Sequence, residues 1–324
     1  MPSLFSLPDL HAAAALIRPV VPPTPQIVWP LLAERVGTEV WVKHENHTPT
    51  GAFKVRGGLV LMDRLKREHP DCPGIVSATR GNHGQSLAYA GRRAGVPVTI
   101  VVPHGNGREK NAAMRALGAE LIEAGADFDA AKAEAARIAE TRGLRWVPAF
   151  GPELVTGVAT YALELFTAAP DLDAVYVPIG SGSGICAVIG VRDLLGLRTE
   201  VIGVTAAGAP AFAHSFAAGH VVEGCPADTF ADGVAVRQPP QLALDIVRAG
   251  ASRIVEVTDA EIAEAMRAYY TDTHNIAEGA GATPLAAVLQ ERASLRGRKV
   301  AVVLSGGNVD RDVYARVLGE AQAA

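Results

Sequence analysis

The chain has 324 residues, of which 49% are hydrophobic and 20% charged, and its formal net charge is −4. That length allows two lobes or one large α/β domain, and the composition is that of an ordinary globular protein. The absence of a basic excess argues against a nucleic-acid partner, and no apolar stretch approaches the ~20 residues that would predict a membrane partner.

The N-terminal segment 1–23 predicts a helix and not a secretory leader. It has no basic start, and Asp9 and His11 break its short apolar run. Cys72, Cys186 and Cys225 lie far apart with no CxxC spacing, which is typical of small buried thiols in a reducing compartment. Both features predict a cytoplasmic protein.

Short β-branched runs alternate with Ala- and Leu-rich helical segments along the chain. The predicted strands are 39–43, 74–77, 98–102, 119–122, 174–178, 200–204, 253–257 and 299–304. The predicted helices are 82–94, 109–117, 128–142, 184–194, 259–269 and 283–292, with a further helical run over 59–67. This alternation predicts an α/β fold of two lobes, each a largely parallel sheet covered by helices on both faces.

The units between 74 and 151 are compact, and we expect them to form a small domain. The segments 1–67 and 152–324 would then form a large, ligand-binding domain. Ligands of open α/β sheets bind at the carboxyl ends of the strands, where loops lead into helices. Four loops of this kind carry candidate functional residues.

The first loop, TPTGAFKVRGG over 48–58, places Lys54 just inside a predicted helix start, among glycines and apolar residues. Desolvation and a positive helix N-terminus both lower the pKa of a lysine, which favours the neutral, nucleophilic amine. An isolated lysine is more often a solvated surface residue, so this interpretation depends on the other loops.

The second loop, SATRGNHGQ over 77–85, follows a predicted strand directly. Small residues at such a turn expose backbone N–H groups that could bind a carboxylate. Asn82 could donate to a phenolate oxygen or could simply cap the following helix. The candidate substrate-binding residues are Ser77, Thr79, Arg80, Gly81, Asn82 and His83.

The third and fourth loops follow later strands. PIGSGSG over 178–184 favours a phosphate, because alternating Gly and Ser free the backbone and add hydroxyl donors. It matches neither a Walker A loop nor GxGxxG. In LSGGN, over 304–308, the Ser305 hydroxyl could meet a ring nitrogen.

Together the loops resemble the fold-type II pyridoxal phosphate (PLP) enzymes, specifically the serine/threonine dehydratase and serine racemase family. The motifs TGAFKVRGG, RGNHGQ, GSGSG, ADGVAV and LSGGN occur in the family's order through nearly the whole chain. The resemblance implies PLP as the cofactor and a fold similar to that of tryptophan synthase β. It implies Lys54 as the Schiff-base lysine, Phe53 packed near the cofactor, and Asn82 at the cofactor's 3′-oxygen.

The same resemblance implies further cofactor contacts. The phosphate loop would be Gly180, Ser181, Gly182, Ser183 and Gly184. Ser305 would meet the pyridine nitrogen, while Gly233 and Glu278 would border the cofactor. A serine at the ring nitrogen need not keep that nitrogen protonated, which suits prompt loss of a β-leaving group over long-lived carbanions.

The implied activity is dehydration of a β-hydroxy-α-amino acid such as threonine or serine, giving a 2-oxo acid and ammonia. Lys54 would take the α-proton. Arg80 stands where racemases of the family carry a serine, and a guanidinium is a poor general base, so racemisation is disfavoured. Arg80 remains a catalytic candidate that could grip a carboxylate or orient the substrate.

Several alternatives stay open. The substrate could be phenylserine or, through Arg80, 3-hydroxyaspartate. Racemisation, β-replacement as in cysteine synthases, and a non-catalytic module that binds PLP or amino acids are the rival functions.

Metal, regulation and assembly also follow from the resemblance. Thr205, Ala209 and Ala211 stand where metal-binding relatives carry acidic residues, so no metal is expected there. The chain ends soon after the last predicted strand, so no C-terminal regulatory domain is expected. The expected partners are a small amino-acid substrate and a second copy of the chain in a homodimer.

Overall fold

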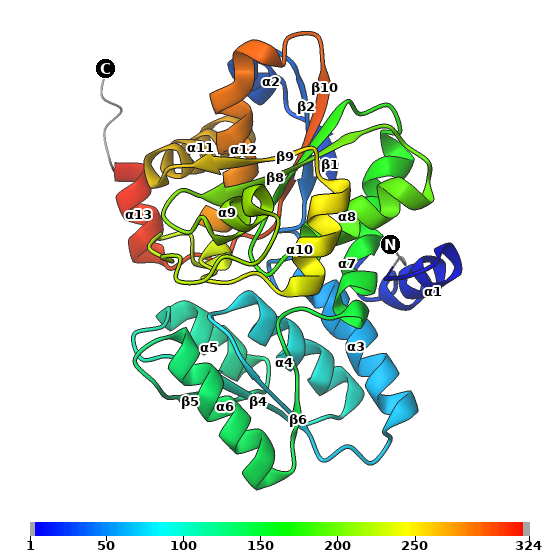
Figure 1. Cartoon of the computed structure of the whole chain (residues 1–324), viewed down its shortest axis with the longest axis vertical. Coiled ribbons are helices and arrows are strands. Elements are labelled where there is room, and N and C mark those ends of the chain that lie inside the picture. The colour runs from blue at the N-terminus through cyan, green and yellow to red at the C-terminus, as the bar shows by residue number, and fades with distance from the viewer. Residues whose placement is uncertain (1–3, 320–324) are drawn as a thin grey trace.

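The computed structural model describes residues 4–319, which form two lobes, each built on its own β-sheet (Figure 1). The larger sheet has the order β1-β2-β10-β7-β8-β9, and the smaller has the order β5-β4-β3-β6. Every pairing is parallel except that of β1 with β2. The larger sheet comprises β1 (Gln26–Val28), β2 (Glu39–His44), β7 (Ala174–Pro178), β8 (Glu200–Ala206), β9 (Arg253–Val257) and β10 (Lys299–Leu304). The smaller comprises β3 (Ile75–Ala78), β4 (Val98–Val102), β5 (Glu120–Glu123) and β6 (Arg145–Trp146).

All eight predicted strands are present within one or two residues, and the predicted α/β class is confirmed. The short strands β1 and β6 lie at sheet edges and had no sequence signal of their own. Their three and two residues are too few to show an alternating pattern.

Helices cover both faces of each sheet. Those expected from the sequence are α1 (Leu7–Ile17), α3 (Lys54–Glu68), α4 (Asn82–Ala94), α5 (Arg108–Ala116), α6 (Phe128–Arg142), α8 (Ser183–Leu194), α11 (Asp259–Thr273) and α12 (Gly279–Glu291). The structure adds α2 (Pro30–Val36), α7 (Pro152–Ala168), α9 (Ala211–Ala218), α10 (Gln241–Gly250) and α13 (Arg311–Gly319). None of the helices in this described part of the chain is long and apolar enough to cross a membrane.

Local chemistry sets several helix ends. A capping box of Thr258 and Glu261 begins α11, and the Asp127 carboxylate accepts from the backbone N–H of Ala130 to begin α6. Gly95 ends α4 with φ at 66°, a left-handed conformation that glycine adopts without the Cβ penalty. These caps fix where each helix starts and stops.

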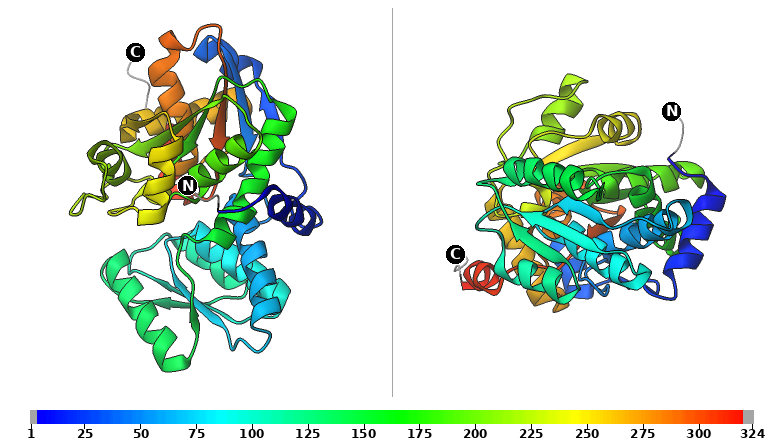
Figure 2. Two further views of the ribbon diagram at one scale, coloured as in Figure 1. Left: turned by 45° about the vertical axis from the view of Figure 1, so that its right-hand side comes forward. Right: turned by 90° about the horizontal axis from the view of Figure 1, so that it is seen from below.

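Apolar clusters form the layers. One face of the larger sheet packs against α2, α11 and α12, and the other packs against α7, α8 and α10. The smaller sheet lies between α6 on one side and α3, α4 and α5 on the other, as the view from below in Figure 2 shows. Because all but one of the strands are parallel, the carboxyl ends within each sheet lie at one edge. There the candidate loops meet.

The strands of the smaller sheet all fall between residues 74 and 151, whereas the larger sheet uses strands on both sides of that segment. The exact domain limits stay a prediction. Helix α3 bears on them, because Val55, Leu59 and Met62 pack in the same cluster as residues of the smaller sheet. The helix also lies against α7, so it connects the two lobes.

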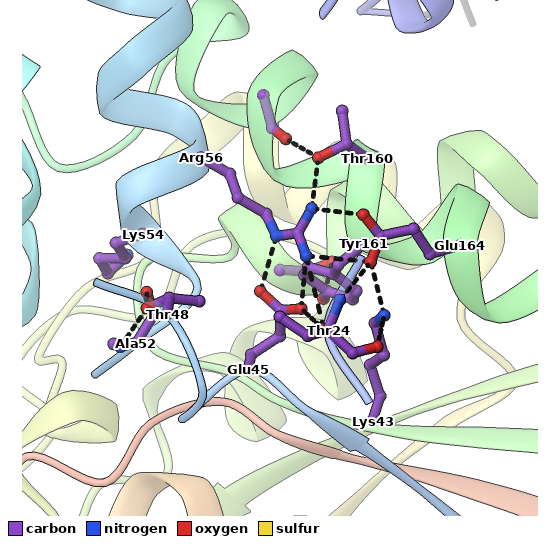
Figure 3. A network of polar contacts seen from close by, with 12 residues as sticks. Thr24, Lys43, Glu45, Thr48, Ala52, Lys54, Arg56, Thr160, Tyr161 and Glu164 are labelled. Carbon is purple, nitrogen blue, oxygen red and sulfur yellow. Dashed lines mark hydrogen bonds and ion pairs between the residues drawn. The ribbon is translucent and has the colours of Figure 1, made fainter. Parts of the chain in front are cut away.

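A buried network of charged groups anchors the start of α3 (Figure 3). The Arg56 guanidinium donates from Nε and Nη2 to both carboxylate oxygens of Glu45, at 2.8 and 2.9 Å. It also donates from Nη1 and Nη2 to Glu164 of α7, at 2.7 and 3.0 Å. Lys43 of β2 donates to Glu164 at 2.6 Å and to the Thr24 carbonyl at 3.0 Å. We call these side chains, with that of Thr160, the Arg56 network.

Candidate active site

The sequence motifs converge on one cavity between the two lobes. Its lining includes Phe53, Lys54, Thr79, Arg80, Gly81, Asn82, His83, Gly180, Ser181, Gly182, Ser183, Gly184, Gly233, Glu278 and Ser305. These residues come from segments that are up to 252 positions apart in the chain, so the fold alone brings them together.

Lys54 is the first residue of α3 and lines this cavity. Its Nζ is 3.4 Å from Ser183 Oγ and 4.8 Å from the centroid of the Phe53 ring. Burial lowers the pKa of the Lys54 amine to about 8, while the nearby Glu278 carboxylate opposes that shift. About a tenth of the amine is therefore neutral and nucleophilic at pH 7, far more than for an ordinary lysine.

Backbone contacts hold Ser305 beside this lysine. The Phe53 N–H donates to the Ser305 carbonyl at 3.0 Å, and the Gly307 N–H donates to the Gly51 carbonyl at 2.9 Å. Gly51 has φ at 66°, and a Cβ there would lie 2.7 Å from Asn308 Oδ1. The first and fourth predicted loops are thus locked together, and only glycine fits at position 51.

The loop 180–184 leads into α8 with a geometry that suits an anion, and we call it the anion cradle. Gly182 has φ at 93°, and a Cβ on Gly180 would collide with the carbonyl oxygen of Gly233. The first turn of a helix leaves backbone N–H groups without intrahelical partners, and its dipole favours negative charge. The hydroxyl of Tyr161, from α7, donates to the Gly184 carbonyl at 3.2 Å and so helps to hold this loop in place.

Asn82 joins the two lobes through its amide. Its Nδ2 donates to Glu278 Oε1 at 2.6 Å, and its Oδ1 accepts from Asn308 Nδ2 at 2.8 Å. Asn308 also donates to the Thr50 carbonyl at 2.8 Å. Asn308 had no role in the sequence-based prediction. Its position as the last residue of the LSGGN motif was the sequence feature that could have identified it as a site residue.

Three charged side chains lie together at the cavity wall, and of these only Glu278 had a role in the sequence-based prediction. Lys110 of α5 donates to both carboxylate oxygens of Asp232, at 2.8 and 2.6 Å, and its Nζ lies 3.5 Å from Glu278 Oε2. We call Lys110, Asp232 and Glu278 the Lys110 cluster. Asp232 lies in the ADGVAV motif, whereas Lys110 carries no local signal.

Burial dominates the electrostatics of this cluster. It raises the pKa of the Glu278 carboxyl to about 7, although the Lys110 charge acts in the opposite direction. Burial also disfavours the charged form of Lys110, but Glu278 and Asp232 overcome it and raise the pKa of that amine. Glu278 therefore changes charge near neutral pH, within contact of Asn82.

The predicted substrate loop is only partly exposed to the cavity. Thr79, Arg80, Gly81, Asn82 and His83 line it. The prediction for Ser77 is not supported by its position, because it is fully buried and does not line the cavity.

The Ser77 hydroxyl donates to the Val147 carbonyl at 2.7 Å. Ser77 lies within β3, and successive side chains of a strand point to opposite faces. The hydroxyl therefore serves the sheet and not a ligand.

His83 lines the cavity as a neutral ring. Burial, helped by the charge of Lys54, lowers the pKa of its imidazole to about 3. Its Nε2 has no hydrogen-bond partner within residues 4–319.

The expectation of no metal rested on Thr205, Ala209 and Ala211, which are buried. Within the described chain no three His, Cys, Asp or Glu side chains are grouped as metal ligands would be.

Comparison with known proteins defines the class. The family described as "Pyridoxal-phosphate dependent enzyme" matches residues 17–306, so the chain belongs to the PLP-dependent enzymes. Within that class it is a lyase of fold-type II, in the serine/threonine dehydratase family. The sequence-based predictions of family, fold, enzyme class and cofactor are confirmed.

Individual relatives cover nearly the whole chain. An L-threonine ammonia-lyase of Thermotoga maritima is 36% identical over 320 residues, which are 98% of this chain and 79% of that protein. The processed threonine deaminase isoform 2 of Solanum lycopersicum superposes with a TM-score of 0.88 at 30% identity, over 99% of this chain and 96% of that one. A PLP-dependent aspartate racemase superposes with a TM-score of 0.91 at 27% identity, over 96% and 98%.

Proposed function

We propose that this lyase removes water from a β-hydroxy-α-amino acid of the threonine or serine type and releases a 2-oxo acid and ammonia. The observation that carries the proposal is the meeting, in one cavity, of the Lys54 amine, the anion cradle 180–184 and the first turn of α4. The names of the relatives, L-threonine ammonia-lyase and threonine deaminase, support it.

The residues present fit PLP. The cradle at 180–184, where a Cβ on Gly180 would collide with Gly233, suits a phosphate monoester. Asn82 has a second amide hydrogen for the 3′-oxygen, and Ser305, held by the Phe53 N–H, offers a hydroxyl to a ring nitrogen. When bound, the cofactor supplies an aldehyde for an amine and a ring that accepts an electron pair from the α-carbon.

The chain's own residues handle the substrate and its protons. The N–H groups at the start of α4 bind the α-carboxylate, since a helix N-terminus favours an anion. Lys54 Nζ, with its pKa near 8, receives the α-proton. Burial lowers the pKa of the His83 imidazole to about 3, which makes it too weak a base to compete for this proton. A guanidinium is a poor general base, so Arg80 does not compete either. The electron pair of the broken α-C–H bond forms the double bond to the β-carbon, and the proton that Lys54 takes up balances the departing β-hydroxyl, which leaves as water. A second water hydrolyses the released enamine to the 2-oxo acid and ammonia.

The test is Lys54→Ala, with Lys66→Ala as the matched control, since Lys66 is an exposed lysine at the other end of α3. We expect Lys54→Ala to lower 2-oxo acid formation from threonine and serine by more than about 1,000-fold. Borohydride reduction followed by peptide mass spectrometry should find the cofactor on Lys54 in the wild type. Full activity of Lys54→Ala, or a cofactor attached elsewhere, would contradict the proposal.

The same assay separates the rival functions. Product that appears only with an added thiol nucleophile would indicate β-replacement, and a D-amino acid without 2-oxo acid would indicate racemisation. A change in the cofactor's visible spectrum without any product would indicate a non-catalytic binding module. Phenylserine belongs in the substrate panel because Phe128 and Val236 add apolar surface to the cavity.

Location and assembly are also proposals. The three cysteines are free thiols, Cys186 and Cys225 being buried, which supports a reducing compartment such as the cytoplasm. A homodimer stays an expectation of the family resemblance, and native mass spectrometry would measure it.

A further inference from the structure

We infer that Arg80 binds a second anionic group on the substrate, so that the preferred substrate is a β-hydroxy amino acid with a side-chain carboxylate, such as 3-hydroxyaspartate. The inference rests on the proposed function, because it concerns which β-hydroxy amino acid enters the same cavity. Three observations carry it: an unpaired charge, separate sites for the other anions, and the charge balance of the cavity.

The first observation is that the charge of Arg80 has no counterpart. The lysines and arginines that line the cavity are Lys54, Arg80 and Lys110. Lys110 is paired with Asp232 at 2.6 Å, and burial favours the neutral form of Lys54. Arg80 makes no hydrogen bond or ion pair with any residue in 4–319. An arginine that lines a ligand cavity and has no partner among the described residues is free to pair with a ligand's carboxylate.

The second observation is that the other anions of this reaction have sites of their own. The α-carboxylate would bind at the first turn of α4, a helix of 13 residues whose leading N–H groups have no intrahelical partners. The phosphate has the cradle 180–184, on the opposite lobe from Arg80. Arg80 directly precedes Gly81, the N-cap of α4, so it adds a charged donor beside the N–H groups that serve the α-carboxylate.

The third observation is the balance of charge around Arg80. Asp232 and Glu278 face the cavity but already surround Lys110, and the pKa of Glu278 near 7 leaves that carboxyl partly protonated. His83 is neutral. A substrate with one more carboxylate would neutralise Arg80, whereas the methyl of threonine or the hydrogen of serine would leave it unpaired. A phenyl ring would offer only the weaker attraction between a cation and a π-face.

The experiment compares binding first, with analogues that cannot lose an α-proton. The dissociation constants of α-methylaspartate and α-methylserine are measured with the holoenzyme by titration calorimetry. We expect α-methylaspartate to bind about 100-fold more tightly to the wild type. Arg80→Gln should remove most of that difference, and Arg80→Lys should restore part of it, because a lysine keeps the charge but not the two-pronged geometry.

Turnover gives the second readout. For the wild type, kcat/KM should be higher with a diastereomer of 3-hydroxyaspartate than with threonine, serine or phenylserine. Arg80→Gln should lower the ratio of kcat/KM for 3-hydroxyaspartate to kcat/KM for threonine by about 20-fold or more. The control is Arg92→Gln, which removes the same charge from the exposed far end of α4 and should change neither value.

Each contrary outcome has a distinct meaning. Equal binding of the two analogues to the wild type, or equal losses for both in Arg80→Gln, would overturn the role of Arg80 in recognising a second anion. A preference for phenylserine would overturn it as well. If no β-hydroxy amino acid gives a 2-oxo acid but α-methylaspartate binds through Arg80, the proposed dehydration fails while the recognition stands.

Discussion

Two clusters of buried charged side chains flank Lys54, and they differ in how completely their charges are paired. In the Arg56 network, Arg56 and Lys43 face Glu45 and Glu164, two cations against two anions. All three nitrogens of the Arg56 guanidinium donate to side-chain oxygens. In the Lys110 cluster, one cation faces two carboxylates, and Glu278 Oε2 has no hydrogen bond with the described residues.

The completeness of charge pairing in each cluster corresponds to its surroundings. The Arg56 network lies between α3, β2 and α7, where a full set of partners fixes the start of α3 and with it Lys54 (Figure 3). The Lys110 cluster faces the cavity, where an incomplete set of partners leaves Glu278 able to change its charge. A saturated network specifies structure, and an unsaturated one at a cavity wall is suited to function.

Arg56→Met should produce the largest effect, because it leaves Glu45 charged, buried and without its main partner. We expect the free energy of unfolding, measured by urea denaturation, to fall by roughly 3–5 kcal/mol. The matched control is Arg64→Met on the same helix, whose partners Glu68 and Glu153 are partly exposed, and which should cost less than about 1 kcal/mol. Similar losses in the two variants would remove the contrast between the clusters.

Glu278→Gln should produce an intermediate effect that depends on pH. The folded-state pKa of Glu278 is raised to about 7 from 4.5, so between these values the unfolded chain releases a proton that the folded chain keeps. This carboxyl's contribution to stability is therefore complete below pH 4.5 and is lost as the pH rises through 7.

Since the glutamine does not titrate and keeps the acceptor for Asn82, the variant should match the wild type near pH 4.5. At pH 8 it should be more stable, on the order of 2 kcal/mol, by urea denaturation across that range. A difference that does not vary with pH would show that Glu278 does not titrate in this range.

Lys110→Met should have the smallest effect on stability. It removes the cation, but Asp232 is partly exposed and Glu278 can take up a proton, so neither carboxylate is left as a fully buried charge. We expect a loss of about 1 kcal/mol at pH 6 in urea denaturation and a larger loss at pH 8. A loss at pH 6 as large as that of Arg56→Met would mean that the Lys110 cluster is structural too.

Much of this protein could be read from local sequence. The eight predicted strands are short β-branched runs, and Lys54, the cradle 180–184 and Ser305 lie in or beside glycine-containing loops, in which Gly51 and Gly182 have positive φ. Such signals are complete within about ten residues, because strand burial, turn conformation and helix starts depend on neighbours in the chain. Helix α7 had no such signal, because its own apolar residues lie on most sides of the helix and its sequence therefore shows no distinct polar face.

The remaining features were decided by the tertiary structure. The sequence placed Ser77 in the substrate loop. In the structure it lies in β3, and its hydroxyl donates to the Val147 carbonyl. The contact between Lys110 and Asp232 joins residues that are 122 positions apart, and that between Arg56 and Glu164 joins residues 108 apart. Local sequence determined which residues form strands and turns and where Lys54 stands at a helix start, and packing determined which charges meet and which stay unpaired. The physical reason is that a charged side chain finds its partner through space, after the sheets have stacked, and not along the chain.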